Sequence, residues 1–201
     1  FRSAGKDYIV FHDDKMIYIT DRKGARRVLP DSTAAPNSQS IFYLIEKDQK
    51  EASLITSTTK NEWMRIYLAS GKTELKSIFF DGDQKHQFLH LPTQDRFVML
   101  LSSKILIMNK NGDMELSTES GSNQIAEAKV VINTNAQELI SYTDTLPQKT
   151  FLTDGNGIAL SGFPIKAKST VVIIKSGQNP TEILEVFNNS DNIISARKKA
   201  E

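Results

Sequence analysis

The feature that most constrains the fold is a strand-and-turn pattern that recurs along the chain. A β-rich segment runs into a polar residue, usually Asp or Asn, then a short turn containing glycine, and then a second β-rich segment. Clear copies occupy residues 16–24, 105–112 and 149–157, and residues 65–73 form a looser copy. Glycine supplies the positive φ that tight hairpins demand, so each copy predicts an antiparallel β-hairpin.

The spacing of these turns indicates a repeat of about 44 residues, the length of a four-stranded propeller blade. Gly24, Thr73, Gly112 and Gly157 stand at equivalent places, and the intervals between them are 49, 39 and 45 residues. We therefore treat the chain as one all-β domain of repeated units. The units are expected at residues 1–30, 38–82, 86–120, 126–165 and 168–197.

The segments between the turns also favour β-strands. Short runs rich in β-branched and aromatic residues are bounded by Gly, Asn, Asp, Pro or Ser, and no segment shows a long helical period of apolar residues. The predicted fold is a β-propeller-like ring of four-stranded antiparallel blades, with about five units, or a segment of a larger propeller. A β-sandwich is the alternative, because short strands at regular spacing fit it as well.

The pattern is less regular at its two ends. The first and last units each lack a strand, which suits a ring closed by joining the chain ends or a segment of a larger ring. In the last unit, Asn179 and Pro180 are typical of a helix start. Residues 180–188 are therefore expected to form either a strand or a short helix.

A family resemblance rests on residues 152–165, LTDGNGIALSGFPI. This stretch resembles the D-x-x-G-x-x-x-x-G-F-P strand-turn-strand of FG-GAP and PQQ-like propeller repeats. In those repeats an apolar strand, a polar loop and a Glu-Ile pair follow, as residues 171–175, 176–180 and 182–183 do here. The resemblance is clearest over residues 149–187. It implies a binding or scaffolding propeller, often on exported or envelope proteins, and it implies no reaction.

Two features of these families are not matched. FG-GAP repeats often carry an acidic calcium loop, but residues 175–180 (KSGQNP) hold no carboxylate, and a hard cation prefers several anionic oxygens. The tryptophan pattern of PQQ-enzyme blades is missing too, because Trp63 is the only tryptophan. We therefore expect no calcium, no other cofactor and no dependence on metal.

Composition excludes several classes of partner. The chain has 25 Lys and Arg against 24 Asp and Glu, so no global field favours nucleic acid. It has no cysteine, which removes disulfides and thiolate chemistry. Its longest apolar runs, such as residues 41–45, are far shorter than the roughly 20 residues of a membrane span. Phe1 opens the sequence without a basic-then-apolar leader, so we expect a trimmed or processed product.

The motifs that resemble catalytic or metal sites have simpler explanations. Residues 70–73 (SGKT) look like the end of a phosphate loop, but position 66 is Ile where the motif needs Gly, so a hairpin turn is expected. His86 and His90 are four residues apart and could face one metal on a strand, but no third ligand has an evident spacing. We expect structural histidines, no metal ligand and no catalytic residue.

Three residues are the candidate partner-binding positions. Trp63 follows a polar loop at residues 58–62, and a role in strand packing is its alternative. Arg22 and Arg26 belong to a basic hairpin, and interface energy concentrates in anchors of these types.

The sequence thus predicts a non-enzymatic recognition or scaffold module that binds a protein or glycan partner through loops at one rim. We expect it in the cell envelope or outside the cell, including the periplasm, with the cytoplasm as the alternative. A propeller-based enzyme acting on glycans and a structural spacer of a larger protein are the other readings. The rim loops are expected at residues 31–40, 57–62, 81–86, 92–95, 121–126 and 144–148.

Overall fold

The computed structural model describes residues 1–13, 15–32, 34–36, 41–46, 52–78, 85–133, 135–175, 183–188 and 194–198. All regular secondary structure in these ranges is β-strand. None of these residues belongs to a helix with the length and hydropathy of a membrane span. The chain divides into two compact units, Phe1–Gln84 and Lys85–Glu201, which are described separately.

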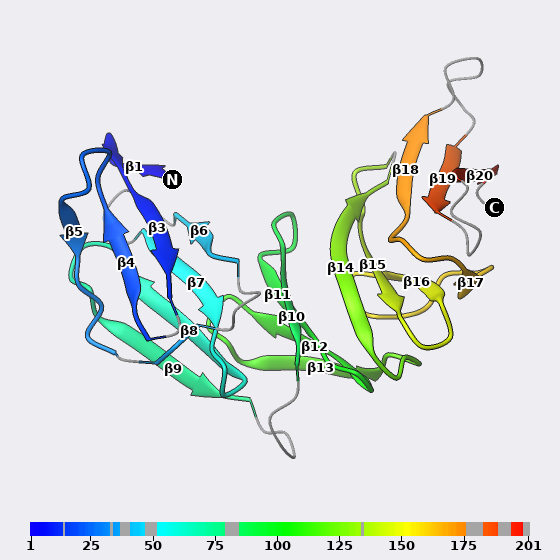
Figure 1. Cartoon of the computed structure of the whole chain (residues 1–201), viewed down its shortest axis with the longest axis horizontal. Helices are drawn as coiled ribbons and strands as arrows, with labels where there is room; N and C mark the ends of the chain where they lie inside the picture. The colour runs from blue at the N-terminus through cyan, green and yellow to red at the C-terminus, as the bar shows by residue number, and fades with distance from the viewer. Residues whose placement is uncertain are drawn as a thin grey trace. The chain divides into compact units, whose positions relative to one another are not determined.

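Unit 1 contains a short hairpin and two antiparallel sheets (Figure 1). The strands of each sheet follow one another in chain order, so each sheet is a meander. The hairpin pairs β1 (Arg2–Ser3) with β2 (Lys6–Asp7). The first sheet is β3 (Ile9–His12), β4 (Ile17–Thr20) and β5 (Arg26–Val28), and the second is β6 (Tyr43–Ile45), β7 (Ser53–Ser57), β8 (Glu62–Tyr67) and β9 (Thr73–Ser77).

The two sheets of unit 1 share an apolar core. In β4, Ile17 and Ile19 are buried and alternate with half-buried polar neighbours, because successive side chains of a strand point to opposite faces. Burial of such side chains contributes about 25 cal/mol for each Å² of apolar surface removed from water. The buried members of the cluster are Tyr8, Ile17, Ile19, Val28, Phe42, Ala52, Leu54, Met64, Ile66 and Leu68.

Unit 2 contains three antiparallel sheets, again meanders (Figure 1). The first is β10 (Gln87–Leu91), β11 (Arg96–Leu100), β12 (Lys104–Asn109) and β13 (Met114–Glu119). The second is β14 (Ile125–Ile132), β15 (Glu138–Asp144), β16 (Lys149–Asp154) and β17 (Ile165–Lys166). The third is β18 (Val172–Lys175), β19 (Ile183–Asn188) and β20 (Ile194–Lys198).

The strands of unit 2 have the order expected of propeller blades. The first strands of successive sheets contact one another, β10 with β14 and β14 with β18. The last strand β13 is exposed along most of its length, whereas β15 is buried throughout. The first sheet of unit 2 therefore has an exposed outer edge, and the second has a buried interior strand. The core between the first two sheets consists of Leu89, Leu91, Val98, Leu100, Ile105, Ile107, Ile140, Tyr142 and Phe151.

The repeated turns share one hydrogen-bond pattern. In the turn after β4, the Asp21 side chain accepts hydrogen bonds from the backbone N–H groups of Lys23 and Ala25, and Gly24 N–H donates to the Asp21 carbonyl. Asn109 and Asp154 organise the turns after β12 and β16 in the same way. The third strand of each of those two sheets therefore ends in the same Asx turn.

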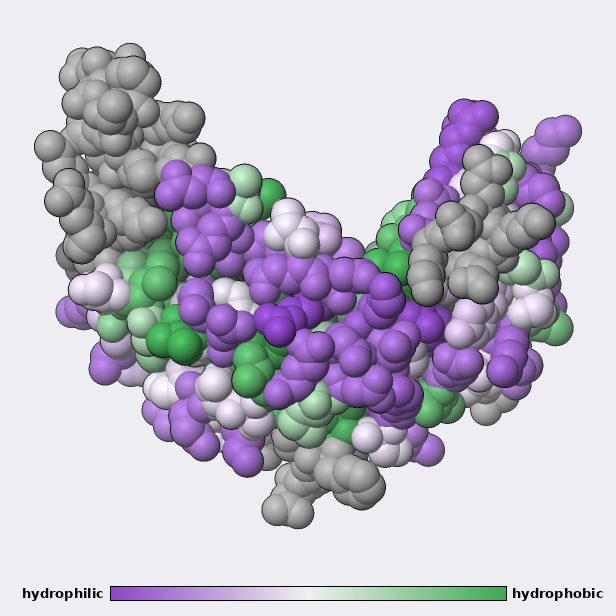
Figure 2. Space-filling view, turned by 180° about the vertical axis from the view of Figure 1, so that it is seen from behind, coloured by the Kyte–Doolittle hydropathy of each residue, from purple (hydrophilic) through white to green (hydrophobic). Residues whose placement is uncertain are grey.

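The sequence prediction of an all-β fold with four-stranded, propeller-like antiparallel blades is confirmed. The segment 183–188 is a strand, which decides between the two alternatives for that part of 180–188, while residues 176–182 lie outside the described residues. The first and last sheets each show three strands in the described part of the chain. The face seen in Figure 2 is mostly hydrophilic, with hydrophobic side chains in small separate patches.

Candidate functional site

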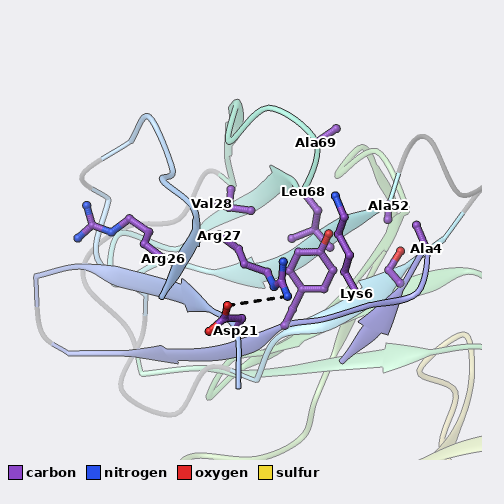
Figure 3. Close-up of a pocket in the computed structure, with 11 residues that line it drawn as sticks. Ala4, Lys6, Asp21, Arg26, Arg27, Val28, Ala52, Leu68 and Ala69 are labelled. Atoms are coloured by element: carbon purple, nitrogen blue, oxygen red, sulfur yellow. Dashed lines mark ion pairs between the residues drawn. The ribbon is translucent and has the colours of Figure 1, made fainter. Parts of the chain in front are cut away.

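A pocket of about 430 Å³ opens in unit 1 where the β1–β2 hairpin, β5 and the turn after β8 come together (Figure 3). Its volume falls within the range of small-molecule sites, about 300 to 1,000 Å³. We call it the basic pocket. Its lining residues are Ser3, Ala4, Lys6, Tyr8, Asp21, Arg26, Arg27, Val28, Ala52, Leu68 and Ala69.

The floor of the basic pocket belongs to the apolar core of unit 1. Tyr8, Val28, Ala52 and Leu68 line the pocket and are also buried members of the core cluster, each no more than 8% exposed. Because both sheets of unit 1 hold these side chains in place, the floor is formed without a ligand.

One wall of the basic pocket is cationic. Lys6, Arg26 and Arg27 line it together with a single carboxylate, Asp21. Neither Lys6 nor Arg26 forms an ion pair with any residue that the structure describes. Figure 3 shows the Arg26 side chain extending away from Lys6 and Arg27, which line the same pocket.

The Arg27 guanidinium is held in place by three groups. Its Nε–H donates to the backbone carbonyl of Asp7 at 2.7 Å. Its terminal nitrogen lies 4.0 Å from the Asp21 carboxylate, which is an ion pair without a hydrogen bond. Its central carbon lies 5.8 Å from the centre of the Tyr8 ring, within cation–π range. Arg27 is therefore oriented by the protein while its terminal N–H groups remain available.

Asp21 carries its negative charge at neutral pH. The hydrogen bond from the backbone N–H of Lys23 lowers the pKa of the Asp21 carboxyl most. Desolvation raises this pKa, but the N–H of Ala25 and the charge of Arg27 lower it further, so the net shift is downward. The basic pocket thus presents three cations and one anion. Its field favours an anionic ligand over a neutral one.

The three sequence-predicted binding residues occupy different environments. Arg26 lines the basic pocket. Arg22 lies outside its lining, with a side chain 74% exposed, and pairs with both carboxylate oxygens of Asp7 at 3.0 and 3.2 Å. Trp63 is 0% exposed. The structure therefore favours the packing role of Trp63 over the partner-binding role.

Trp63 is covered by two cationic side chains of its own sheet. The Arg65 guanidinium carbon lies 5.1 Å from the centre of a Trp63 ring, and the Lys76 ammonium lies 5.9 Å from it. Lys76 is opposite Trp63 in the β8–β9 register. Since these cations shield the indole within the chain, a partner would have to displace them to reach it.

Other pocket residues were missed by the sequence analysis. Lys6 stands alone in a mixed segment, and it reaches the pocket because the β1–β2 hairpin folds back beside β5. Ala52 and Leu68 belong to the β6–β9 sheet and its turn, more than 20 residues from β5. Such long-range proximity leaves no local signal in one sequence. Of the pocket residues that were not predicted, only Arg27 could have been suspected from the sequence, because it belongs to the same basic hairpin as Arg22 and Arg26.

A second pocket, of about 350 Å³, lies between two of the expected rim loops of unit 1. The Thr58 hydroxyl donates to the Glu62 carboxylate at 2.9 Å and accepts from the backbone N–H groups of Lys60 and Glu62. The charged and hydroxyl groups here are largely engaged in their own turn. The lining residues are Ser32, Ala34, Ala35, Thr58, Thr59, Lys60, Glu62 and Leu75.

The described residues considered as catalytic or metal-binding candidates lie in or next to strands and turns. His86 is buried, and the His90 ring stacks on Phe97 at 4.6 Å between centroids. Within the described ranges, no three His, Asp or Glu residues are arranged to hold a metal ion. Asp81 and Asp83, the carboxylates that precede His86 in the sequence, lie outside those ranges. The Ser70 hydroxyl accepts from Lys72 N–H in the turn between β8 and β9, as predicted for a hairpin.

Unit 2 contains a contrasting buried cluster around the carboxylate of Asp144, at the end of β15. Asp144 is 1% exposed and accepts hydrogen bonds from the Ser122 hydroxyl, Asn123 N–H and Leu146 N–H. The Tyr142 hydroxyl donates to the Ser120 carbonyl at 2.6 Å. Burial raises the pKa of the Tyr142 phenol, so it remains a donor. We call this set the Asp144 cluster.

No protein-family model matches the sequence, and no curated protein matches it either. The fold, in contrast, is similar to solved structures. An auxiliary nutrient binding protein from Bacteroides thetaiotaomicron VPI-5482 aligns with a TM-score of 0.55 and 10% identity, over 96% of this chain and 57% of that chain. Raptor from Chaetomium thermophilum aligns with a TM-score of 0.59 and 11% identity, over 96% of this chain and 20% of that one.

A third similar structure is BBS1N in complex with ARL6DN, with a TM-score of 0.51, 12% identity and coverage of 84% of this chain and 55% of that one. This chain therefore spans less than two thirds of the length of each of the three. At such low identity, the likeness concerns the fold alone. The chain shares a propeller-like fold with these proteins.

Proposed function

We propose that this chain is a non-enzymatic binding module that recognises a glycan through the basic pocket. The observation that carries the proposal is a preformed pocket with an apolar floor, lined by Lys6 and Arg26, which form no ion pair within the described chain. Sugars present C–H faces and hydroxyl groups together, so they need both apolar contact and convergent polar groups. Tyr8 and Leu68 offer the first, and Ser3, Lys6 and Asp21 offer the second.

The chemistry of the lining favours binding over catalysis. Most glycoside hydrolases use two carboxyl groups on either side of the scissile bond. The lining of the basic pocket contains one, Asp21, and no histidine. The lowered pKa of Asp21 also makes it a poor proton donor at neutral pH. A binding module is the simpler function for this arrangement.

A similar fold supports the proposal as an analogy. One structure with this fold is named an auxiliary nutrient binding protein. We further propose that the chain acts in the cell envelope or outside the cell, where polysaccharides are encountered. The FG-GAP-like stretch at residues 152–165 is in keeping with a recognition role.

An array of immobilised oligosaccharides probed with the whole chain tests the proposal. We expect a defined set of glycans to bind, and the double variant Lys6→Gln/Arg26→Gln to lose at least about tenfold in affinity, the equivalent of one charge-assisted hydrogen bond. The matched control is Lys104→Gln/Lys149→Gln, which removes the same charge from exposed positions of unit 2. Absence of glycan binding, or equal losses of affinity in the two double variants, would overturn the proposal. Binding to an acidic protein but to no glycan would show that the partner is a protein.

A further inference from the structure

The orientation of Arg27 narrows the class of ligand that the basic pocket suits. The guanidinium has five N–H donors in a planar fork. One of them is committed to the Asp7 carbonyl, and no hydrogen bond joins the others to the part of the chain that the structure describes. A planar carboxylate matches such a fork through two parallel hydrogen bonds.

Lys6 adds a second positive charge to the same place. Its side chain lines the same pocket as Arg27, and it forms no ion pair with the described residues. Two cations therefore line one small pocket, while Asp21 approaches Arg27 only to 4.0 Å. Their mutual repulsion is relieved when an anion lies between them.

Asp21 adds a hydrogen-bond acceptor beside the cations. Its carboxylate lines the pocket and lies 4.0 Å from Arg27. A carboxylate can accept hydrogen bonds from the hydroxyl groups of a ligand. The pocket is thus suited to a planar carboxylate that carries neighbouring hydroxyls.

We infer that the basic pocket binds the carboxylate of an acidic sugar, with Arg27 as its bidentate partner and Lys6 as the second cation. This inference rests on the proposed glycan-binding function and adds the charge of the ligand to it. In the bound state the sugar ring lies against the floor formed by Val28, Ala52 and Leu68, and its hydroxyls face Asp21 and Ser3. Arg26, whose side chain extends away from Lys6 and Arg27, contacts the adjoining part of the glycan.

The test compares tri-galacturonic acid with its methyl ester by isothermal titration calorimetry. The two ligands have the same sugar rings and differ in charge. We expect the acid to bind the whole chain at least about tenfold more tightly than the ester, with an affinity that falls as salt is raised. The variant Arg27→Lys keeps the charge but loses the fork, so it should lose about tenfold for the acid and little for the ester.

Each outcome distinguishes the inference from the proposal beneath it. Equal binding of acid and ester, with both weakened in Lys6→Gln, overturns the acidic-sugar inference and leaves glycan binding intact. Tighter binding of a sulfated trisaccharide than of the acid also overturns it, because a tetrahedral group would then be preferred. If neither Lys6→Gln nor Arg27→Lys changes the affinity for the acid, the acidic-sugar inference is overturned, and so is the proposal that the basic pocket is the binding site.

A melting curve accompanies each variant, because Arg27 also ties the hairpin to β5 through the Asp7 carbonyl. If Arg27→Lys fails to fold, Lys6→Gln alone decides the question, since Lys6 has no side-chain bond to lose in the described chain. Loss of the preference for acid over ester in that variant supports the inference. Retention of the preference contradicts it.

Discussion

The basic pocket of unit 1 and the Asp144 cluster of unit 2 are both built around an aspartate in a turn, but they use its charge differently. Asp21 is partly exposed, accepts hydrogen bonds from two backbone N–H groups and lines a pocket that also holds three cationic residues. Asp144 is buried, and three donors from its own unit surround it. The first arrangement leaves charge available to a ligand, whereas the second uses charge to fix two loops.

The pKa of Asp144 shows that hydrogen bonds within the protein compensate for the burial of its charge. Burial raises the pKa, but the N–H of Asn123, the hydroxyl of Ser122 and the N–H of Leu146 more than offset it. The net result is a lowered pKa and a carboxylate that is ionised at neutral pH. The comparison teaches that a buried carboxylate whose hydrogen bonds are all made within the protein stabilises the structure. An exposed carboxylate among more numerous cations leaves charge that a ligand can bind.

The largest expected effect on stability comes from replacing Trp63. This substitution tests whether Trp63 packs in the core or binds a partner. Trp63→Ala should lower the free energy of unfolding by about 3 to 5 kcal/mol, as for other large buried aromatic residues. Urea denaturation of the whole chain measures it. Trp63→Phe, which retains most of the volume, should keep glycan affinity within about twofold, a change well below 1 kcal/mol. Unchanged stability together with lost binding would instead make Trp63 a contact residue.

The second effect is the loss of the Asp144 carboxylate. Asp144→Ala leaves three donors without an acceptor, so we expect the free energy of unfolding to fall by about 3 kcal/mol. Asp21→Ala, made at an exposed turn, should lower it less. Equal losses in the two variants would contradict the comparison between the two aspartates.

The same carboxylate predicts a pH dependence. Its pKa is lower in the folded chain than in the unfolded chain, so its contribution is complete above the unfolded value of about 3.9. That contribution is lost as the pH falls through the lower pKa of the folded state. Urea denaturation of the parent chain between pH 5 and pH 2.5 should therefore show a steeper decline in stability than in Asp144→Asn.

A smaller effect is expected from His90 in β10. Burial lowers the pKa of the His90 imidazole from its ordinary 6.5, while the charges of Asp95 and Glu138 oppose that shift. The unfolded chain therefore takes up a proton at a higher pH than the folded chain, and stability decreases as the pH falls below about 6.5. His90→Gln should flatten the dependence of the urea midpoint on pH between 7.5 and 5.5. An unchanged slope would show that groups other than His90 cause this pH dependence.

The smallest effect on stability is expected at the basic pocket itself. Lys6→Gln and Arg26→Gln remove no ion pair within the described chain, so each should change the free energy of unfolding by less than about 0.5 kcal/mol. Removal of charge repulsion near Arg27 makes a slight gain the expected direction. A loss of several kcal/mol in the same urea assay would show that these cations are structural, like Asp144.

The sequence supports the fold better than the site because turns are local. Asp21, Asn109 and Asp154 each precede a glycine at a fixed distance, and the backbone groups they bind lie within four residues. Similar turns at Thr58 and Asn133 escaped notice because Asn61 and Ala136 occupy the positive φ where glycine would be the signal. A residue other than glycine adopts positive φ because the surrounding structure imposes it, and that structure cannot be inferred from one sequence.

The basic pocket is assembled over longer distances. Arg26 was found because it belongs to a local cluster of cations, but its distinction from Arg22 depends on Asp7, which pairs with Arg22 across 15 residues of chain. Trp63 was recognisable as an anchor type, yet its burial depends on tertiary packing. Pairing and burial determine which charged and aromatic residues remain available for a ligand, and both require the folded structure.

Hydrogen exchange of the whole chain with and without tri-galacturonic acid tests the central claim most directly. If the basic pocket binds an acidic sugar, the ligand should slow exchange at residues 1–8, 21–28 and 67–70, which form or adjoin its lining. It should leave residues 120–124 and 144–148 of the Asp144 cluster unchanged. Slowed exchange confined to those segments of unit 2, or no change anywhere at a saturating concentration, would contradict the account.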